Sequence, residues 1–166
     1  MTADEVFRAH GAAIHRWATQ LGGPGFDADD AVQEVFIVVH QRVAKFVPGA
    51  AQLTTWLYEI TRNIVRGQRR KSKWSWFSRA GEKALVEVPD ERTPADALEA
   101  QRARQKLYAV LDRLSERDRE VLILFELERM SGEEIAQLMD ARVATVWVWL
   151  HRARKRFTEL AQERQS

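Results

Sequence analysis

The chain has 166 residues and contains no cysteine. Disulfide bonds, thiolate zinc sites and cysteine nucleophiles are therefore excluded, and the composition fits a cytoplasmic protein. Long apolar runs are also missing, since none approaches the roughly 20 residues that a membrane-spanning helix needs. The N-terminal stretch MTADEVFRAH is acidic and amphipathic, unlike a signal peptide.

A large excess of one charge is missing too, because the formal net charge is only +2. Any surface for nucleic acid must therefore come from local segregation of charge. Such segregation exists: Arg62–Arg79 holds seven basic residues and Arg142–Arg156 holds five, with no acidic residue in either. Asp112–Glu134 instead holds eight acidic residues against four arginines. Two separate cationic surfaces suit a protein that touches one duplex at two places.

The stretch Ser131–Phe157 predicts two helices joined by a tight turn. Ser131 and Glu134 have the spacing of a capping box, which begins a helix. Asp140–Arg142 interrupts the apolar period, which then resumes at Val146, Leu150, Ala153 and Phe157. This arrangement is a helix-turn-helix, whose second helix enters the major groove of DNA.

The second of these helices has a distinct outer face. At about 100° per residue, the side opposite the apolar stripe carries Ala144, Val148, His151, Arg152 and Lys155. Trp147 and Trp149 fall on the two flanks. An ordinary surface helix with a basic last turn is the alternative. A strand at the alternating VWVW run is disfavoured, because the run lies inside a longer helical period.

The remaining periodicity is helical as well. The first half predicts helices at about Asp4–Leu21, with Phe7 in its apolar stripe, and at about Ala28–Phe46; a third, capped by Thr54 or Thr55, runs to about Lys71. The second half predicts a helix at Ala95–Arg113, with Leu98 turned inward, and another that is capped by Ser115 and ends near Arg129. We therefore expect an all-α protein with two small helical domains, residues 1–72 and 95–166, joined by a flexible linker at 73–94.

Other chemistry finds little support in the residues. Asp27, Asp30 and Glu34 have a spacing that suits a hard cation, but helix capping and surface charge explain them more simply. No nucleophile–base pair, phosphate-binding loop or metal cluster is visible, so we expect neither catalysis nor a cofactor. The aromatic segment Trp74–Phe77 lies among basic residues. It is expected to dock onto a domain or a protein partner, with a membrane surface as the alternative.

Two motifs resemble a known family. DADDAVQEVFIVVHQRVAKF followed by TTWLYEITRN resembles the conserved helices of domain two in bacterial RNA polymerase sigma factors. LSERDREVLILFELERMSGEEIAQLMDARVATVWVWLHRARKRF resembles sigma domain four. The two-domain layout is similar to the extracytoplasmic-function (ECF) group of the sigma-seventy family, and the resemblance covers about Asp4–Phe157.

The resemblance implies an alternative sigma factor without catalysis of its own. Its domain two would join core RNA polymerase and help open the minus-ten element, and its domain four would bind the minus-thirty-five element. The implied partners are core polymerase (beta-prime clamp helices and beta flap), promoter DNA and an anti-sigma factor, for which Trp74–Phe77 is a candidate contact. The rivals are a helix-turn-helix regulator that does not bind core, and an interaction protein that has lost promoter recognition.

The resemblance also implies site residues. The positions for docking on core polymerase are Asp30, Gln33, Glu34 and Phe36. Phe36 also suits the core of the domain. The positions for the minus-ten element are Phe46, Gln52, Trp56, Tyr58, Arg62, Asn63, Arg66, Arg69 and Arg70, together with the loop Pro48–Gln52. Trp56 is expected to support the base pocket by packing. The positions for the minus-thirty-five element are Arg142, Thr145, Val148, His151, Arg152, Lys155 and Arg156.

The recognition helix departs from the family pattern. The family often reads GTVKSRLHRARKRL, whereas this chain reads ATVWVWLHRARKRF. Trp147 and Trp149 thus replace residues that are often basic, and tryptophan cannot make the bidentate contact of arginine with guanine. We expect His151 and Arg152 to read bases and Val148 to touch a thymine methyl group. The phosphate contacts, which position the protein without specifying sequence, are expected from Arg142, Arg154, Lys155 and Arg156.

Overall fold

The computed structural model describes residues 1–47, 49–78 and 93–165, of which residues 50–52 and 73–78 are described by backbone alone. Every regular element in these ranges is a helix, so the predicted all-α class is confirmed. None of the helices in the described ranges combines the length and apolar composition needed to cross a bilayer. Of the predicted linker 73–94, residues 79–92 lie outside the described residues, as do the side chains of Trp74–Phe77, while residues 73–78 continue the helix before them.

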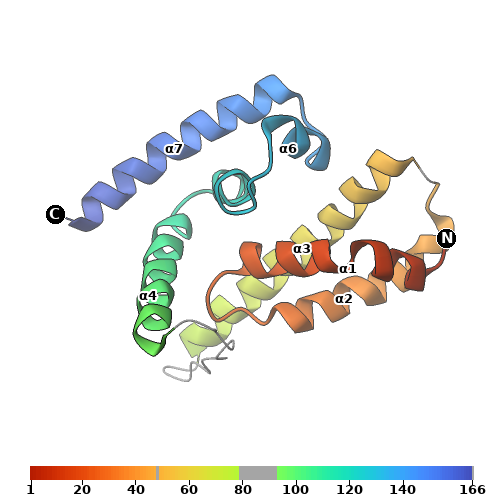
Figure 1. Cartoon of the computed structure of the whole chain (residues 1–166), viewed down its shortest axis with the longest axis horizontal. Coiled ribbons are helices and arrows are strands. Elements are labelled where there is room, and N and C mark those ends of the chain that lie inside the picture. Colours follow the sequence, from red (N-terminus) through yellow and green to blue (C-terminus); the bar gives the residue numbers. More distant parts are fainter. Residues whose placement is uncertain (48, 79–92, 166) are drawn as a thin grey trace.

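The N-terminal domain is a bundle of α1 (Ala3–Gly22), α2 (Ala28–Arg42) and α3 (Ala50–Ser78), with a short 3-10 turn, η1 (Val43–Lys45), after α2 (Figure 1). α1 buries Ile14, Trp17 and Leu21 as predicted. Phe7 was expected in this stripe and is instead 54% exposed, while Val6 beside it is 1% exposed. The ring of Phe7 contacts Phe36 of α2 edge-on at 4.6 Å, which covers only part of it.

The third helix is longer than the sequence predicts. The expected cap at Thr54 or Thr55 is wrong, because α3 begins at Ala50, and the helix continues beyond Lys71 to Ser78. The hydroxyl of Thr55 donates to the carbonyl oxygen of Gln137 at 2.7 Å, which lies in the other half of the chain. A threonine that resembles a cap in the sequence therefore makes a tertiary contact.

The C-terminal domain begins with α4 (Pro94–Leu111) and α5 (Glu116–Leu122). Ser115 caps α5 as predicted, accepting from the backbone N–H of Asp118 at 3.2 Å. The single helix expected to end near Arg129 instead widens into a π-helical turn, η2 (Ile123–Leu127). Leu98, expected to face inward, is 46% exposed, because apolar packing along α4 begins only at Leu107.

The helix-turn-helix is present as α6 (Gly132–Leu138) and α7 (Val143–Gln165). The capping box of Ser131 and Glu134 is confirmed. α6 ends in a left-handed residue, Asp140 with φ 51°, and the N–H of Ala141 donates back to the carbonyl of Ala136 at 2.8 Å. This pattern is a Schellman cap, in which aspartate replaces the usual glycine. The apolar stripe of α7 is buried as predicted, fully at Val146, Leu150 and Ala153 and partly at Phe157.

The two domains pack directly against each other, which the sequence did not predict. Figure 1 shows α5 and η2 end-on between α7 and the N-terminal bundle, with α6 beside the N-terminal part of α3. Tyr108 of α4 is 2% exposed and its hydroxyl donates to the carbonyl of Gln20 at 2.5 Å. Gly23 has φ 84°, and a Cβ there would lie 2.7 Å from the ring of Tyr108. A glycine in this turn therefore allows close contact between the domains.

α6 and α7 approach each other so closely that Gly132 leaves no room for a side chain. A Cβ at this position would lie 2.6 Å from Cζ2 of Trp147. We expect Gly132→Ala to lower the free energy of unfolding by about 1–3 kcal/mol, because the ring must move. Urea denaturation measures this loss.

Gly67→Ala is the matched control, because a Cβ in the middle of α3 meets nothing within 4 Å. It should be neutral or stabilising by up to about 1 kcal/mol. In a Trp147→Ala background Gly132→Ala should lose its cost, and an undiminished cost there would contradict the packing explanation.

Candidate nucleic-acid and polymerase interfaces

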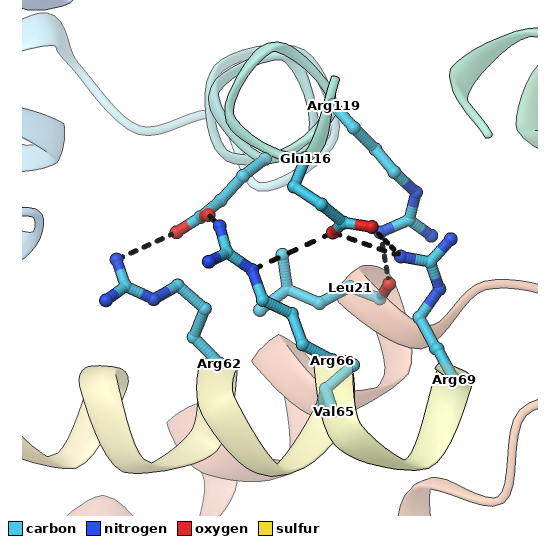
Figure 2. A pocket seen from close by; sticks show the side chains of 8 residues that line it. Leu21, Arg62, Val65, Arg66, Arg69, Glu116 and Arg119 are labelled. Carbon is cyan, nitrogen blue, oxygen red and sulfur yellow. Dashed lines mark hydrogen bonds and ion pairs between the residues drawn. The ribbon is translucent and has the colours of Figure 1, made fainter. Parts of the chain in front are cut away.

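The predicted phosphate-binding arginines of α3 face the C-terminal domain. We call Arg62, Arg66 and Arg69 the arginine row. They lie along one side of the helix at spacings of four and three residues. Opposite this row lie three carboxylates around the start of α5, one of which, Glu116, is labelled in Figure 2. We call Asp112, Glu116 and Glu120 the carboxylate row.

Each arginine of the row is paired. Nη2 of Arg66 lies 2.6 Å from Oε2 of Glu120, and Nη1 of Arg62 lies 3.6 Å from Oε1 of the same carboxylate. Nη2 of Arg69 lies 3.1 Å from Oδ1 of Asp112. Glu116 lies within 3.7 Å of Arg66 and 3.4 Å of Arg69. In this conformation the arginine row is occupied by protein carboxylates.

Tyr58 was predicted to face the minus-ten element, and in this structure the residue is 1% exposed. Its hydroxyl donates to Oε1 of Glu120 at 2.5 Å, and its ring meets Trp17 edge-on at 5.3 Å. Burial raises the pKa of the Tyr58 phenol well above its usual range, and the charge of Glu120 adds to the effect. Tyr58 is therefore a neutral donor that holds the carboxylate.

A second buried arginine joins the domains. Arg119 is 3% exposed, donates from Nη1 to the carbonyl of Leu21 at 2.6 Å and from Nε to Asp112 at 3.0 Å. Burial lowers its pKa, with repulsion from Arg69 as the next cause. Sequence reasoning missed Arg119, since a basic residue in an acidic stretch reads as surface charge.

The other predicted minus-ten residues are spread along α3 from its first turns to beyond its middle. Phe46, which follows η1, stacks on Trp56 with ring centroids 4.8 Å apart. Asn63 is exposed two turns further along the same side of α3, and Arg70 is exposed beyond it. The side chain of Gln52 lies outside the described residues, as does Pro48.

The outer face of α7 carries the predicted minus-thirty-five residues. Val148, His151, Lys155 and Arg156 are exposed along α7, Arg142 is exposed just before its first residue, and Thr145 is partly buried. The side chain of Arg152 is 57% exposed, and its Nη2 lies 3.2 Å from Oδ1 of Asp118. Arg154 pairs instead with Glu126 at 2.9 Å, on the side of η2.

The two tryptophans of α7 serve packing. Trp147 lies over Gly132 and meets Phe125 edge-on at 5.8 Å, while remaining 44% exposed. The ring of Trp149 lies 4.6 Å from the guanidinium of Arg117. Their flanking positions agree with the predicted helical geometry. They fasten α7 to α5, η2 and α6.

The predicted docking surface on α2 is accessible. Asp30, Gln33 and Glu34 are all exposed. Nε2 of Gln68 on α3 lies 3.2 Å from Asp30 and 2.8 Å from Glu34, so the two carboxylates are held in place. Asp27 caps α2 by accepting from the N–H of Asp30 at 3.0 Å. Across the described residues, no group of three or more metal-binding side chains lies close enough to hold an ion.

Sequence reasoning missed one residue of this surface. Ile37 is 57% exposed and lies seven residues after Asp30, which places it on the same side of α2. Phe36 turns away toward Phe7 and is partly buried. The helical spacing contained this information, but an isoleucine within the run VFIVV reads as core.

Comparison with known proteins decides the family. Residues 6–75 match the model of sigma-70 region 2, and residues 101–157 match sigma-70 region 4. The ECF RNA polymerase sigma factor EcfG of Rhodopseudomonas palustris is 31% identical over 89% of this chain and 78% of that protein. The chain belongs to the ECF group of the sigma-70 family. The predicted family is thereby confirmed.

Other relatives agree with this assignment. The ECF sigma-E factor of Escherichia coli is 32% identical to this sigma factor over 80% of this chain and 72% of its own length. The chain spans 60% of the length of SigE from Mycolicibacterium smegmatis, with 31% identity. The solved structure of CnrH in complex with the cytosolic domain of CnrY matches 97% of this chain and 88% of that one, with a TM-score of 0.60 and 26% identity.

The two tyrosines give the domain contact a pH dependence. Burial raises the pKa of Tyr108 as well as that of Tyr58. Each phenol therefore holds its proton more tightly in the folded state. Its contribution to stability is complete below the unfolded-state pKa of about 10 and is lost as pH rises through the folded-state pKa.

Absorbance of tyrosinate at 295 nm checks this expectation. The native protein should ionise at higher pH than the urea-unfolded protein, and the unfolding temperature should fall above pH ~10. Tyr58→Phe and Tyr108→Phe, each of which leaves one phenol, assign the two steps. Superimposable native and unfolded titrations would contradict the burial of both groups.

Proposed function

We propose that this chain is an alternative sigma factor that directs core RNA polymerase to specific promoters and assists promoter opening. The observation that carries the proposal is the presence of regions 2 and 4, in order, within a relation to EcfG that spans most of both chains. Sigma factors are initiation factors that bind without catalysing, and this one acts in the cytoplasm with polymerase. A plain regulator with a helix-turn-helix would leave region 2 without a role.

The minus-ten element is assigned to the side of α3 that carries Trp56, Asn63 and Arg70. The stacked pair of Phe46 and Trp56 forms an apolar wall, and Asn63 offers an amide on the same side of the helix. Aromatic walls with a few hydrogen-bonding groups are what an unstacked base requires. The exposed Arg70 supplies phosphate contact directly, whereas the arginine row becomes available only when the carboxylate row leaves it.

The minus-thirty-five element is assigned to the outer face of α7. His151 and Arg152 are the hydrogen-bonding groups at its centre, with Val148 one turn before them. Arg142, Lys155 and Arg156 supply charge for phosphates. Because Trp147 and Trp149 are engaged in packing, specificity rests on fewer polar side chains than the family pattern provides.

Core polymerase is assigned to the exposed side of α2. Asp30, Gln33 and Glu34 form its polar part and Ile37 its apolar centre, which suits the beta-prime clamp helices; the beta flap would meet domain four. An anti-sigma factor is a further proposed partner. The supporting neighbours are CnrH with CnrY, and the sigma factor RpoE of Bartonella quintana with its anti-sigma factor NepR.

Transcription by reconstituted polymerase tests the two DNA sites. With core enzyme and a promoter mapped in cells that overproduce this factor, we expect stable co-purification and promoter-specific run-off product. Arg152→Ala should weaken duplex minus-thirty-five binding by about 1–3 kcal/mol. Asn63→Ala should reduce open-complex formation and leave binding to the duplex element unchanged.

Lys106→Ala is the control, since it removes one exposed cation of α4 away from both sites. Melting temperatures establish that each variant is folded. Full activity of the Arg152→Ala/Asn63→Ala double variant would overturn the site assignment, and failure to bind core would favour the plain regulator.

Ile37→Glu tests the docking surface. An exposed isoleucine contributes little to the fold, so the unfolding temperature should hardly change, whereas affinity for core polymerase should fall by about 2 kcal/mol or more, as at a central interface residue. Leu98→Glu makes the same kind of change at a 46% exposed site on α4 and should bind core normally. Equal affinities of the two variants for core would remove Ile37 from the interface.

A further inference from the structure

The contact between the arginine row and the carboxylate row has the chemistry of a contact with nucleic acid. A guanidinium presents a planar fork of N–H donors that matches a carboxylate and a phosphate equally well. Arg66 and Arg69 each reach two carboxylates. The carboxylates around the start of α5 thus engage the N–H donors that the phosphates of a strand would need.

The two uses of these arginines exclude each other. The side chain of Arg69 is 9% exposed and those of Arg62 and Arg66 are 24% and 28% exposed. A strand cannot reach them while α5 covers them. Glu120 is 3% exposed, and a carboxylate so buried cannot lose its partners without a large cost. The rows must therefore separate by movement of the whole C-terminal domain.

The rest of the contact is suited to such release. Much of it consists of polar bonds to main-chain carbonyls: Arg119 to Leu21, Tyr108 to Gln20 and Thr55 to Gln137. Water can replace each of these bonds once the surfaces part. Polar contacts between domains of one chain resemble transient interfaces, for which relative motion is the normal expectation.

We propose that the carboxylate row is a built-in inhibitor, which occupies the arginine row in the free chain and keeps it from the phosphates of nucleic acid until the domains separate. The inference rests on the proposed function for the identity of the DNA target. The competition itself needs only a polyanion, so it is measurable without polymerase or promoter.

Distances between the domains provide the first test. Because the chain has no cysteine, Gln41→Cys on α2 and Gln162→Cys on α7, both at exposed positions, give unique sites for a pair of spin labels or dyes. Glu116→Gln with Glu120→Gln should convert one narrow distribution of distances between the labels into a broad one. Rising NaCl should do the same to the labelled chain without these two changes, which tests the idea even if the double variant folds poorly.

The matched control is Glu126→Gln with Glu163→Gln. It removes the same charge from carboxylates that pair within the C-terminal domain, with Arg154 and Arg113. Its distribution of distances should remain narrow. Unchanged distances in the interface variant and in high salt would overturn the proposal.

Binding of a labelled single-stranded oligonucleotide of random sequence to the free protein is the second test. The interface variant should bind about tenfold or more tightly than the control variant, as expected for the loss of one charged hydrogen bond from the closed state. Equal tightening in both variants would mean that net charge alone is responsible and would contradict the inhibitor. Opening without transcription at any promoter would instead contradict the proposed function and leave the competition intact.

Discussion

One buried carboxylate decides how the two halves of this chain meet. Glu120 accepts a hydrogen bond from Tyr58 and pairs with Arg66, both on α3, although it belongs to α5. A buried charge is tolerated only where partners satisfy it, so α5 has few ways to lie on the bundle. The position of α6 against α3 and of Tyr108 against the turn after α1 is compatible with this placement. The polar contact thus fixes the arrangement, beside buried apolar residues of both domains that form one cluster.

Local signals in the sequence were sufficient for much of the fold. Ser115, Ser131 and the stripe of α7 act within a few residues of themselves, and capping and helical spacing predict them. The contact between the domains depends on Tyr58, Arg119 and Glu120, which are far apart in the chain. Their burial is set by tertiary packing, and nothing in their immediate neighbours records it. For this reason the sequence predicts which residues form the candidate sites. It does not predict that the arginine row among them is covered by the carboxylate row.

The recognition helix, α7, shows how a substitution can change a site indirectly. Trp147 and Trp149 take positions where the family often has basic residues, and both rings are used to hold α7 against neighbouring helices. The exchange removes charge from the face toward DNA and adds contacts behind it. A helix presented so firmly loses less freedom on binding, which offsets part of the lost polar contacts. The two tryptophans thus make α7 more rigid and leave it fewer polar side chains for contact with DNA.

The uninterrupted course of α3 has a mechanical consequence. Its 29 residues extend about 43 Å as one helix, with the stacked aromatic pair near its first turns and the arginine row in its middle. A continuous helix of this length is stiff along its axis. A displacement at the aromatic pair, which is assigned to the melted strand, is therefore carried along to the point where the chain leaves the domain. α3 therefore cannot change its length to accommodate differences in spacing between two promoter elements.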